Sequence, residues 1–146
     1  MFNDCTSLAE VMFEESSSLK GIGEQAFWMC GCLRHISLPE GLKYIGHKCF
    51  FGSGLEEITI PSSVAIIKDW GFCGCENLKK VIFQEGSVLR EIEDYCFMSS
   101  GLEEFTAPPG LKRIHGNAFA NCENLKRVIL NEGLKELRDL SYNGVF

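Results

Sequence analysis

Apolar residues recur along this chain in a pattern that repeats at a nearly constant interval. Each copy reads Leu-x-x-Ile/Val-x-apolar, as in Leu55-Glu-Glu-Ile58-Thr-Ile60. In an extended segment the fourth and sixth positions lie on one side of the chain, and the third and fifth lie on the other. The pattern therefore predicts short strands with one buried side. The six leading leucines, spaced by 25, 22, 23, 24 and 23 residues, are Leu8, Leu33, Leu55, Leu78, Leu102 and Leu125.

A second apolar group follows each predicted strand after a turn. In the third copy the turn begins at Pro61, which has no N–H to donate and therefore ends the strand pairing. The apolar pair Val64 and Ile67 comes next, and the small residue Gly71 then precedes Phe72. A unit of about 23 residues cannot bury its own apolar side, but stacked copies bury a continuous core. The repeat therefore predicts a solenoid.

The six repeats together make up a single domain. The approximate bounds of the repeats are 2–32, 33–54, 55–77, 78–101, 102–124 and 125–146. Neither end carries the polar cap that terminal repeats use, and we expect the chain to be a segment of a longer array. The alternative is a short natural protein, in which apolar residues such as Phe13 and Leu130 would favour end-to-end self-association.

The full unit resembles the surface-antigen BspA-like class of leucine-rich repeats. The shared pattern is Leu-x-x-Ile-x-Ile-Pro-x-x-Val-x-x-Ile-x-x-x-Ala-Phe-x-x-Cys, and it extends from Phe2 to about Leu137. The resemblance implies a right-handed solenoid with a parallel β-sheet on the concave face, and with turns and single helical turns elsewhere. Known members are mostly bacterial or protozoan surface proteins that bind host or microbial proteins. A cell-surface or secreted location rests on this resemblance alone, because Met1–Cys5 lacks the features of a secretion signal.

Six of the eight cysteines follow the repeat. Three residues after the phenylalanine, one column of the stack contains Cys5, Cys30, Cys75 and Cys122, whereas Cys49 and Cys96 share another column. Such positions favour small, reduced, buried thiols. Only Cys5 and Cys30 belong to adjacent turns, so a disulfide between them stays open. Two Cys-Gly-Cys pairs lie two turns apart, which argues against a shared metal ion.

Paired charges at the second and third strand positions alternate in sign from copy to copy. In order they are Arg34-His35, Glu56-Glu57, Lys79-Lys80, Glu103-Glu104 and Lys126-Arg127. Parallel stacking places each acidic pair between basic pairs, and such cross-strand pairs stabilise a sheet modestly. We interpret this charge ladder either as a patterned binding strip or as a solvent-exposed face that neutralises itself.

The third and fifth strand positions form the predicted contact surface on the concave face. The candidate binding residues are His35, Ser37, Glu57, Thr59, Lys80, Ile82, Glu104, Thr106, Arg127 and Ile129. Leucine-rich solenoids commonly bind through this side of the fold. The sequence therefore favours a protein ligand, with an adhesin-like role as the specific form. The alternative is a structural spacer or intracellular scaffold with no dedicated ligand.

Composition and the placement of reactive residues argue against other classes of function. The net charge is −6, and a nucleic-acid-binding domain would need a basic stripe. No apolar run approaches the ~18 residues of a membrane-spanning helix. The histidines His35, His47 and His115 are not placed to activate a nucleophile beside an orienting acid. We therefore predict a non-catalytic protein with no catalytic residues, no cofactor and no bound metal.

Overall fold

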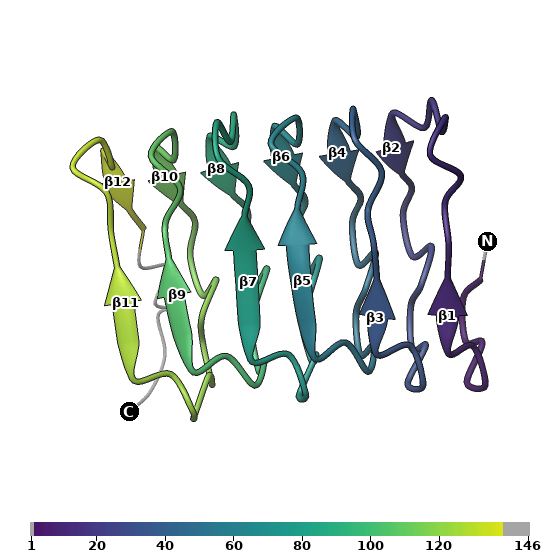
Figure 1. The fold of residues 1–146 in the computed structure, drawn as a ribbon. Helices are drawn as coiled ribbons and strands as arrows, with labels where there is room; N and C mark the ends of the chain where they lie inside the picture. The colour runs from purple at the N-terminus through teal and green to yellow at the C-terminus, as the bar shows by residue number, and fades with distance from the viewer. Residues whose placement is uncertain (1, 139–146) are drawn as a thin grey trace.

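The chain folds as a parallel β-solenoid in which each turn contributes two short strands. The computed structural model describes residues 2–138, and Figure 1 shows the strands in two rows that run from one end to the other. The first row contains β1 (Glu10–Val11), β3 (His35–Ile36), β5 (Glu57–Ile60), β7 (Lys80–Phe83), β9 (Glu104–Thr106) and β11 (Arg127–Ile129). The second row contains β2 (Gly21–Ile22), β4 (Tyr44–Ile45), β6 (Ile66–Ile67), β8 (Glu91–Ile92), β10 (Arg113–Ile114) and β12 (Glu136–Leu137).

Strands in the first row pair in parallel and in register with the repeat. β1 pairs with β3, β5 with β7, and β9 with β11. Backbone hydrogen bonds join these pairs into one row, since the Glu56 N–H donates to the Arg34 carbonyl at 3.1 Å and the Glu103 N–H donates to the Lys79 carbonyl at 3.3 Å. The predicted strands and the predicted solenoid are therefore confirmed.

The second row forms a continuous six-stranded parallel sheet in the order β12-β10-β8-β6-β4-β2. The sequence pattern predicted an apolar pair here, and its second member, such as Ile67, is buried in the second row. It did not predict a sheet, because each strand contains only two residues. Two residues are too few to show the alternation by which strands are recognised.

The expected single helical turns are not found: residues 2–138 contain no helix, and hydrogen-bonded turns connect the strands. The reason lies two residues before each core phenylalanine. In five turns this position has φ between 51° and 61°, at Gln25, Lys48, Trp70, Tyr95 and Asn117. A left-handed residue interrupts right-handed helical geometry, so the chain turns sharply toward the next strand.

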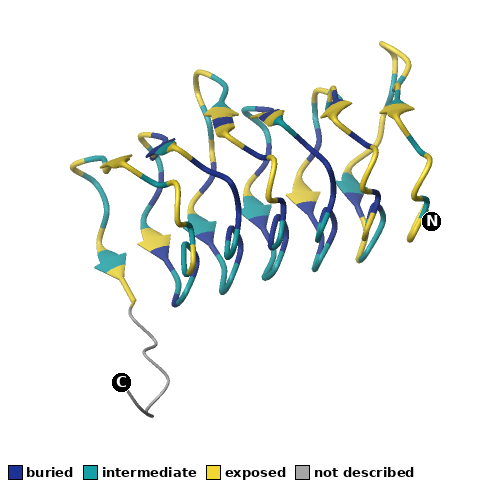
Figure 2. Ribbon diagram, turned by 90° about the horizontal axis from the view of Figure 1, so that it is seen from below, coloured by how far each residue is buried: buried dark blue, intermediate teal, exposed yellow. Residues whose placement is uncertain are grey.

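The core is a continuous apolar column enclosed by the two rows. The leading leucines Leu33, Leu55, Leu78 and Leu102 are completely buried. Six phenylalanine rings stack nearly parallel along the solenoid, with centroids 5.2–5.7 Å apart, from Phe2 through Phe27, Phe50, Phe72 and Phe97 to Phe119. Figure 2 shows buried residues inside the middle turns and more exposed residues at both ends. Neighbouring turns, and not single repeats, therefore build the core.

In the predicted cysteine column Cys30 and Cys75 are buried as expected, whereas Cys5 and Cys122 are half-buried. The thiols of Cys30, Cys75 and Cys122 each donate a hydrogen bond at 3.0 Å to the carbonyl of a phenylalanine in the preceding turn. Ser53 and Ser100 occupy the column in the remaining copies, and their hydroxyls lie 3.3 and 3.4 Å from the thiols of Cys75 and Cys122. All eight cysteines are free thiols.

The predicted domain extends to residue 146, and its residues 139–146 lie outside the part that the structure describes. The repeat boundaries stay a prediction. Each boundary leucine stands two residues before a strand of the first row, as Leu55 stands before β5. The interpretation of the chain as a segment of a longer array stays a prediction.

Candidate functional site

Strand alternation directs the ten candidate residues to the outer face of the first row. In β5 the outward residues Glu57 and Thr59 are exposed, whereas Ile58 and Ile60 are buried. β7 repeats this arrangement with Lys80 and Ile82 outward. Nine of the ten candidates are exposed and Glu104 is half-buried. We call this set of ten side chains the first-row face.

The strand register brings the members of this face together in lateral pairs. Glu57 lies opposite Lys80, and Thr59 lies opposite Ile82. In the same way Glu104 faces Arg127, and Thr106 faces Ile129. His35 faces a residue that the sequence prediction did not include, Glu10 of β1. The signal for Glu10 was present, because it occupies the third position of the first copy.

Shallow depressions lie along this face. One of about 540 Å³ is lined by the charged residues Lys79, Lys80, Glu103, Glu104, Lys126 and Arg127. A second, of about 330 Å³, combines Ile82 and Thr106 with the turn at Pro108 and Pro109. A third, of about 300 Å³, includes His35, Ser37 and Thr59. These open hollows suit contacts with a macromolecular surface better than enclosure of a small molecule.

The charge ladder forms direct ion pairs toward both ends of the face. Arg34 contacts Glu56 at 2.6 Å, and Arg127 contacts Glu104 at 2.5 Å. The hydrogen bond and the charge of Arg127 lower the pKa of Glu104 below its ordinary value. These side chains are solvent-exposed, so water screens the pairs strongly. We therefore expect the ladder to act mainly by favouring the correct register of the stack.

Reversing both central lysines should destabilise the solenoid in a salt-dependent way. Lys79→Glu/Lys80→Glu places three acidic pairs side by side, because Glu57 and Glu104 occupy the flanking strands in register. We expect a lower melting temperature than wild type at low salt, and a smaller difference at ~1 M salt, where the Debye length is ~3 Å. Thermal unfolding followed by circular dichroism measures both values.

The matched control for that variant is Lys20→Glu/Lys43→Glu. It makes the same change in net charge on exposed lysines that precede β2 and β4. The lysines already lie in adjacent turns, since the Lys43 N–H donates to the Lys20 carbonyl at 2.8 Å, so reversal exchanges one like-charge pair for another. Equal melting temperatures for the Lys79/Lys80 variant and wild type at low salt would contradict the ladder.

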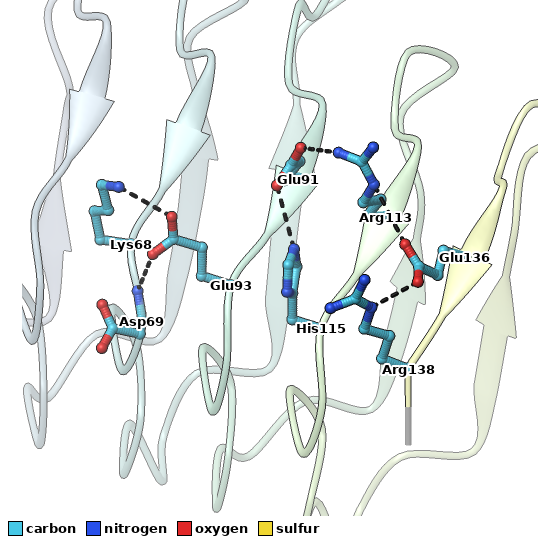
Figure 3. Close-up of polar contacts among 8 residues, drawn as sticks. All are labelled: Lys68, Asp69, Glu91, Glu93, Arg113, His115, Glu136 and Arg138. Atoms are coloured by element: carbon cyan, nitrogen blue, oxygen red, sulfur yellow. Dashed lines mark hydrogen bonds and ion pairs between the residues drawn. The ribbon is translucent and has the colours of Figure 1, made fainter. Parts of the chain in front are cut away.

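A second charged network follows the second row, and the sequence analysis did not predict it. Figure 3 shows its side chains on neighbouring turns. Glu91 binds both His115, at 3.2 Å, and Arg113, which also contacts Glu136 at 3.3 Å. Arg138 lies 2.6 Å from the other oxygen of Glu136. The partners are mostly about 22–24 residues apart, so a search for the repeat period among charged residues could have found them.

A separate group of charged residues lies beside this network (Figure 3). Lys68 donates a 3.0 Å hydrogen bond to one carboxylate oxygen of Glu93, and the backbone N–H of Asp69 donates a 3.0 Å hydrogen bond to the other. Asp69 in turn contacts His47 at 3.0 Å. His47 and His115 therefore both belong to inter-turn ion pairs after strands of the second row. This arrangement locks neighbouring turns together and provides no nucleophile for either histidine to activate.

Acidification should weaken the second-row network. Partial burial pushes the pKa of Glu91 upward, but hydrogen bonds from His115 and Arg113 outweigh this effect, so the pKa lies below its ordinary value of 4.5. A hydrogen bond from Arg138 lowers the pKa of Glu136 as well. A carboxylate with a lowered folded-state pKa stabilises the fold above its unfolded-state pKa, and this stabilisation is lost as the pH falls through the folded-state value.

We therefore expect the melting temperature of wild type to fall between neutral pH and about pH 3, and to fall less in Glu91→Gln. The variant retains the shape of the side chain but removes the titrating group. Melting curves at the two pH values measure the difference. The same loss in both proteins would show that Glu91 does not contribute to acid sensitivity.

The interior thiols are poor nucleophiles. Burial raises the pKa of Cys73 to about 11 and that of Cys75 to about 12. Burial also raises the pKa of Cys49 and Cys96. A thiol must lose its proton to attack or to bind a metal, so these side chains favour packing over chemistry. Among residues 2–138, no group of three or more His, Cys, Asp or Glu side chains is placed to hold a metal ion.

The described residues, 2–138, include no candidate for a membrane-spanning helix.

Residues 43–145, or 103 of the 146 residues, match the family described as BspA type leucine-rich repeat region (6 copies). The chain therefore belongs to the BspA-type leucine-rich repeat family, as the resemblance predicted. The structures of this class are parallel solenoids that serve as scaffolds for protein interaction. A comparison with curated protein sequences finds no match.

Several solved structures are similar to this chain. The pneumococcal vaccine antigen PcpA is 26% identical, with a TM-score of 0.61, over 91% of this chain and 34% of that protein. A leucine-rich repeat protein from Bacteroides ovatus is 25% identical, with a TM-score of 0.56, over 95% of this chain and 56% of that one. A leucine-rich repeat protein from T. pallidum is 24% identical, with a TM-score of 0.77, over 90% of this chain and 70% of that one. This chain thus spans about one third of the pneumococcal antigen and about half of the B. ovatus protein.

Proposed function

We propose that this chain is a non-catalytic protein-binding module and that the first-row face is its contact surface. The observation that carries the proposal is the regular exposure of this face. Nine of the ten side chains project from successive parallel strands, spaced by roughly 4.8 Å, and Ser37 follows β3 directly; only Glu104 among the ten is half-buried. In β3, β5, β7 and β9 the residues between them, Ile36, Ile58, Val81 and Phe105, are buried and hold the strands, so this part of the surface is pre-organised for binding.

The face fits a protein better than a nucleic acid. Its basic residues Lys80 and Arg127, with the adjacent Lys79 and Lys126, alternate with acidic residues, and a phosphate backbone would meet both signs of charge. The exposed apolar side chains Ile82 and Ile129 add contact area beside Thr59 and Thr106. A protein segment with complementary alternating charges and small apolar side chains would match this pattern.

The specific role that we infer is adhesin-like, at a cell surface. Similarity to a pneumococcal vaccine antigen supports this inference, together with membership of the BspA-type family. Because the chain covers 34% of that antigen, the proposal concerns this repeat module alone.

One observation favours a second candidate function, which is a structural spacer or scaffold without a ligand. Arg34 and Arg127 already contact Glu56 and Glu104 within the chain. A face whose charges are satisfied internally can serve solubility and stacking alone. Binding experiments with variants of this face separate the two candidates.

The test compares capture of surface proteins by wild type and by a variant in which His35, Glu57, Lys80 and Glu104 are all neutralised. The matched control neutralises four exposed charges on or near the turns that precede or follow strands of the second row, two of them acidic as on the face, which are Lys20, Glu24, Lys43 and Glu132. We expect wild type and the control to retain the same partner and the face variant to lose it. If the face variant retains the partner, or if wild type captures none, the binding proposal fails and the spacer is favoured.

A further inference from the structure

Charge is distributed unevenly along the first-row face. The depression of about 540 Å³ lies across β7, β9 and β11, and four of its six described lining residues are basic. We call it the basic depression. The depression of about 300 Å³ lies at β3 and β5, where Glu57 contributes a carboxylate and no lysine or arginine is among the described lining residues. The two parts of one face therefore suit partner groups of different charge.

The lysines of the basic depression remain available to a partner. All three are exposed and form no ion pair within residues 2–138; they are Lys79, Lys80 and Lys126. Arg127 is instead held by Glu104, whose carboxylate it contacts at 2.5 Å. Glu103 is the one other carboxylate among the described lining residues. The basic depression therefore carries a surplus of positive charge, which favours a carboxylate from outside the chain.

The depression of about 330 Å³ continues the basic depression along the strands, and most of its lining is apolar. We call it the apolar depression. The two depressions share Lys80 and Glu104, and the second extends past Ile82 to the turn at Pro108 and Pro109. Because a strand rises about 3.3 Å per residue, Ile82 lies roughly 7 Å from Lys80 along β7. A charged contact and an apolar contact are thus within reach of one short segment.

Gln84 forms a fixed wall of the apolar depression. Its Oε1 accepts a 2.8 Å hydrogen bond from the backbone N–H of Ser62, and its Nε2 donates one of 2.8 Å to Glu40, two turns away. Phe83, another lining residue, packs edge to face against Phe105 with ring centroids 5.9 Å apart. Side chains that are already held in place lose little freedom on binding, which favours a defined apolar contact here.

On the basis of the proposed protein-binding function, we infer that the partner's contact segment is an extended peptide that carries carboxylates and, two or three residues away, an apolar side chain. It lies along β7 and β9, which are neighbours in the first row (Figure 1). Its carboxylates contact Lys79, Lys80 and Lys126, and its apolar side chain enters the apolar depression beside Ile82. The charged contacts fix its register on the face, and the apolar contact adds affinity.

Fluorescence anisotropy of labelled peptides with the 146-residue chain tests this inference. The probe is Gly-Ser-Asp-Asp-Thr-Ser-Leu-Val-Ser-Gly, used together with its reverse sequence, because side-chain contacts do not fix the direction of the segment. We expect at least one of the two peptides to bind, and to bind less tightly as added salt screens the exposed charges. Replacing both aspartates with serine should weaken binding roughly fivefold, since exposed ion pairs contribute modestly.

Two variants of the chain locate the bound peptide. Lys79→Ser/Lys80→Ser should weaken binding roughly fivefold through loss of ion pairs, and Ile82→Thr roughly threefold through loss of apolar area. Threonine already occupies the position of Ile82 in β5 and β9, at Thr59 and Thr106, so Ile82→Thr suits the strand. Circular dichroism checks that each variant retains the fold of wild type.

The matched control is Lys20→Ser/Lys43→Ser, which removes two exposed lysines that precede β2 and β4, and we expect it to bind the peptide as wild type does. The inference is overturned if neither peptide binds, if the serine-substituted peptide binds equally well, or if either face variant keeps wild-type affinity. A single-stranded DNA decamer that binds more tightly than the peptides would also overturn it, because the basic depression would then select phosphate.

These outcomes are separate from the outcome of the capture experiment. If the peptides fail while the variant with four neutralised face residues still loses its captured partner, the face binds a protein of different chemistry. If that variant keeps its partner, the first-row face is not the contact surface.

Discussion

Replacing Phe72 with alanine should destabilise the solenoid by about 3–5 kcal/mol, the usual range for removing a buried aromatic side chain. The ring is completely buried and stacks on Phe50 at 5.2 Å and on Phe97 at 5.4 Å. The cavity would lie in the middle of the array, where both neighbouring turns lose contact with the ring. Because each turn is stabilised by its neighbours, the loss should weaken the whole stack. Urea denaturation followed by circular dichroism measures the change.

Phe2→Ala is the matched control for this prediction. Phe2 belongs to the same ring column but is 51% exposed, and within the described chain it stacks on Phe27 alone, at 5.7 Å. We expect a much smaller loss of stability there. If the two substitutions cost the same free energy, the ring stack is not the source of cohesion between turns.

Replacing Gly54 with alanine should cost roughly 1–3 kcal/mol, the range for overpacking a tightly packed site. A Cβ atom at Gly54 would lie 2.1 Å from the carbonyl oxygen of Gly31 in the preceding turn. That oxygen belongs to the backbone, so the turns themselves would have to separate. Gly101 repeats the same close approach two turns later, 2.1 Å from the Glu76 carbonyl oxygen. Differential scanning calorimetry of Gly54→Ala measures the effect.

The control for this prediction is Gly31→Ala, because a Cβ atom at Gly31 meets nothing within 4 Å. We expect this variant to melt close to wild type. A Gly54→Ala protein that melts as high as the control would show that the spacing between turns is more adaptable than the backbone contact indicates.

The first row and the core could be predicted from the sequence because their side chains repeat. Strands such as β5 are long enough to alternate, with the pattern exposed–buried–exposed–buried over Glu57–Ile60. The core phenylalanines and leading leucines recur at one interval, so their common burial followed from stacking.

The second row could not be predicted in the same way. Its strands have two residues each, and parallel pairing with the same segment of the next turn defines them. The left-handed turns could not be predicted from the sequence either, because the residues that adopt them are as different as Lys48, Trp70 and Tyr95. Glycine would have marked such positions, whereas here backbone bonds to the next turn hold the conformation, as the Lys48 N–H does to the Asp69 carbonyl at 3.2 Å.

The candidate face, too, could be predicted only in part from the sequence. Its outward direction followed from strand alternation, and the structure places all ten residues on that side. Its ion pair between Arg127 and Glu104 depends on how far the long arginine side chain reaches, and no spacing rule fixes that reach. In the second row, the lowered pKa of Glu91 depends on hydrogen bonds from His115, in the next turn, and from Arg113, which lies two residues before His115.

Site-specific photo-crosslinking tests the central claim, that the first-row face binds a protein, most directly. A photoreactive amino acid replaces Thr59 on that face or Ala65, an exposed residue of the same turn that precedes β6 in the second row. Each protein is incubated with surface proteins and irradiated, and the crosslinked partner is identified by mass spectrometry. The account predicts a crosslink to one partner from position 59 and none from position 65. Crosslinking from position 65 alone, or equally from both positions, would contradict it.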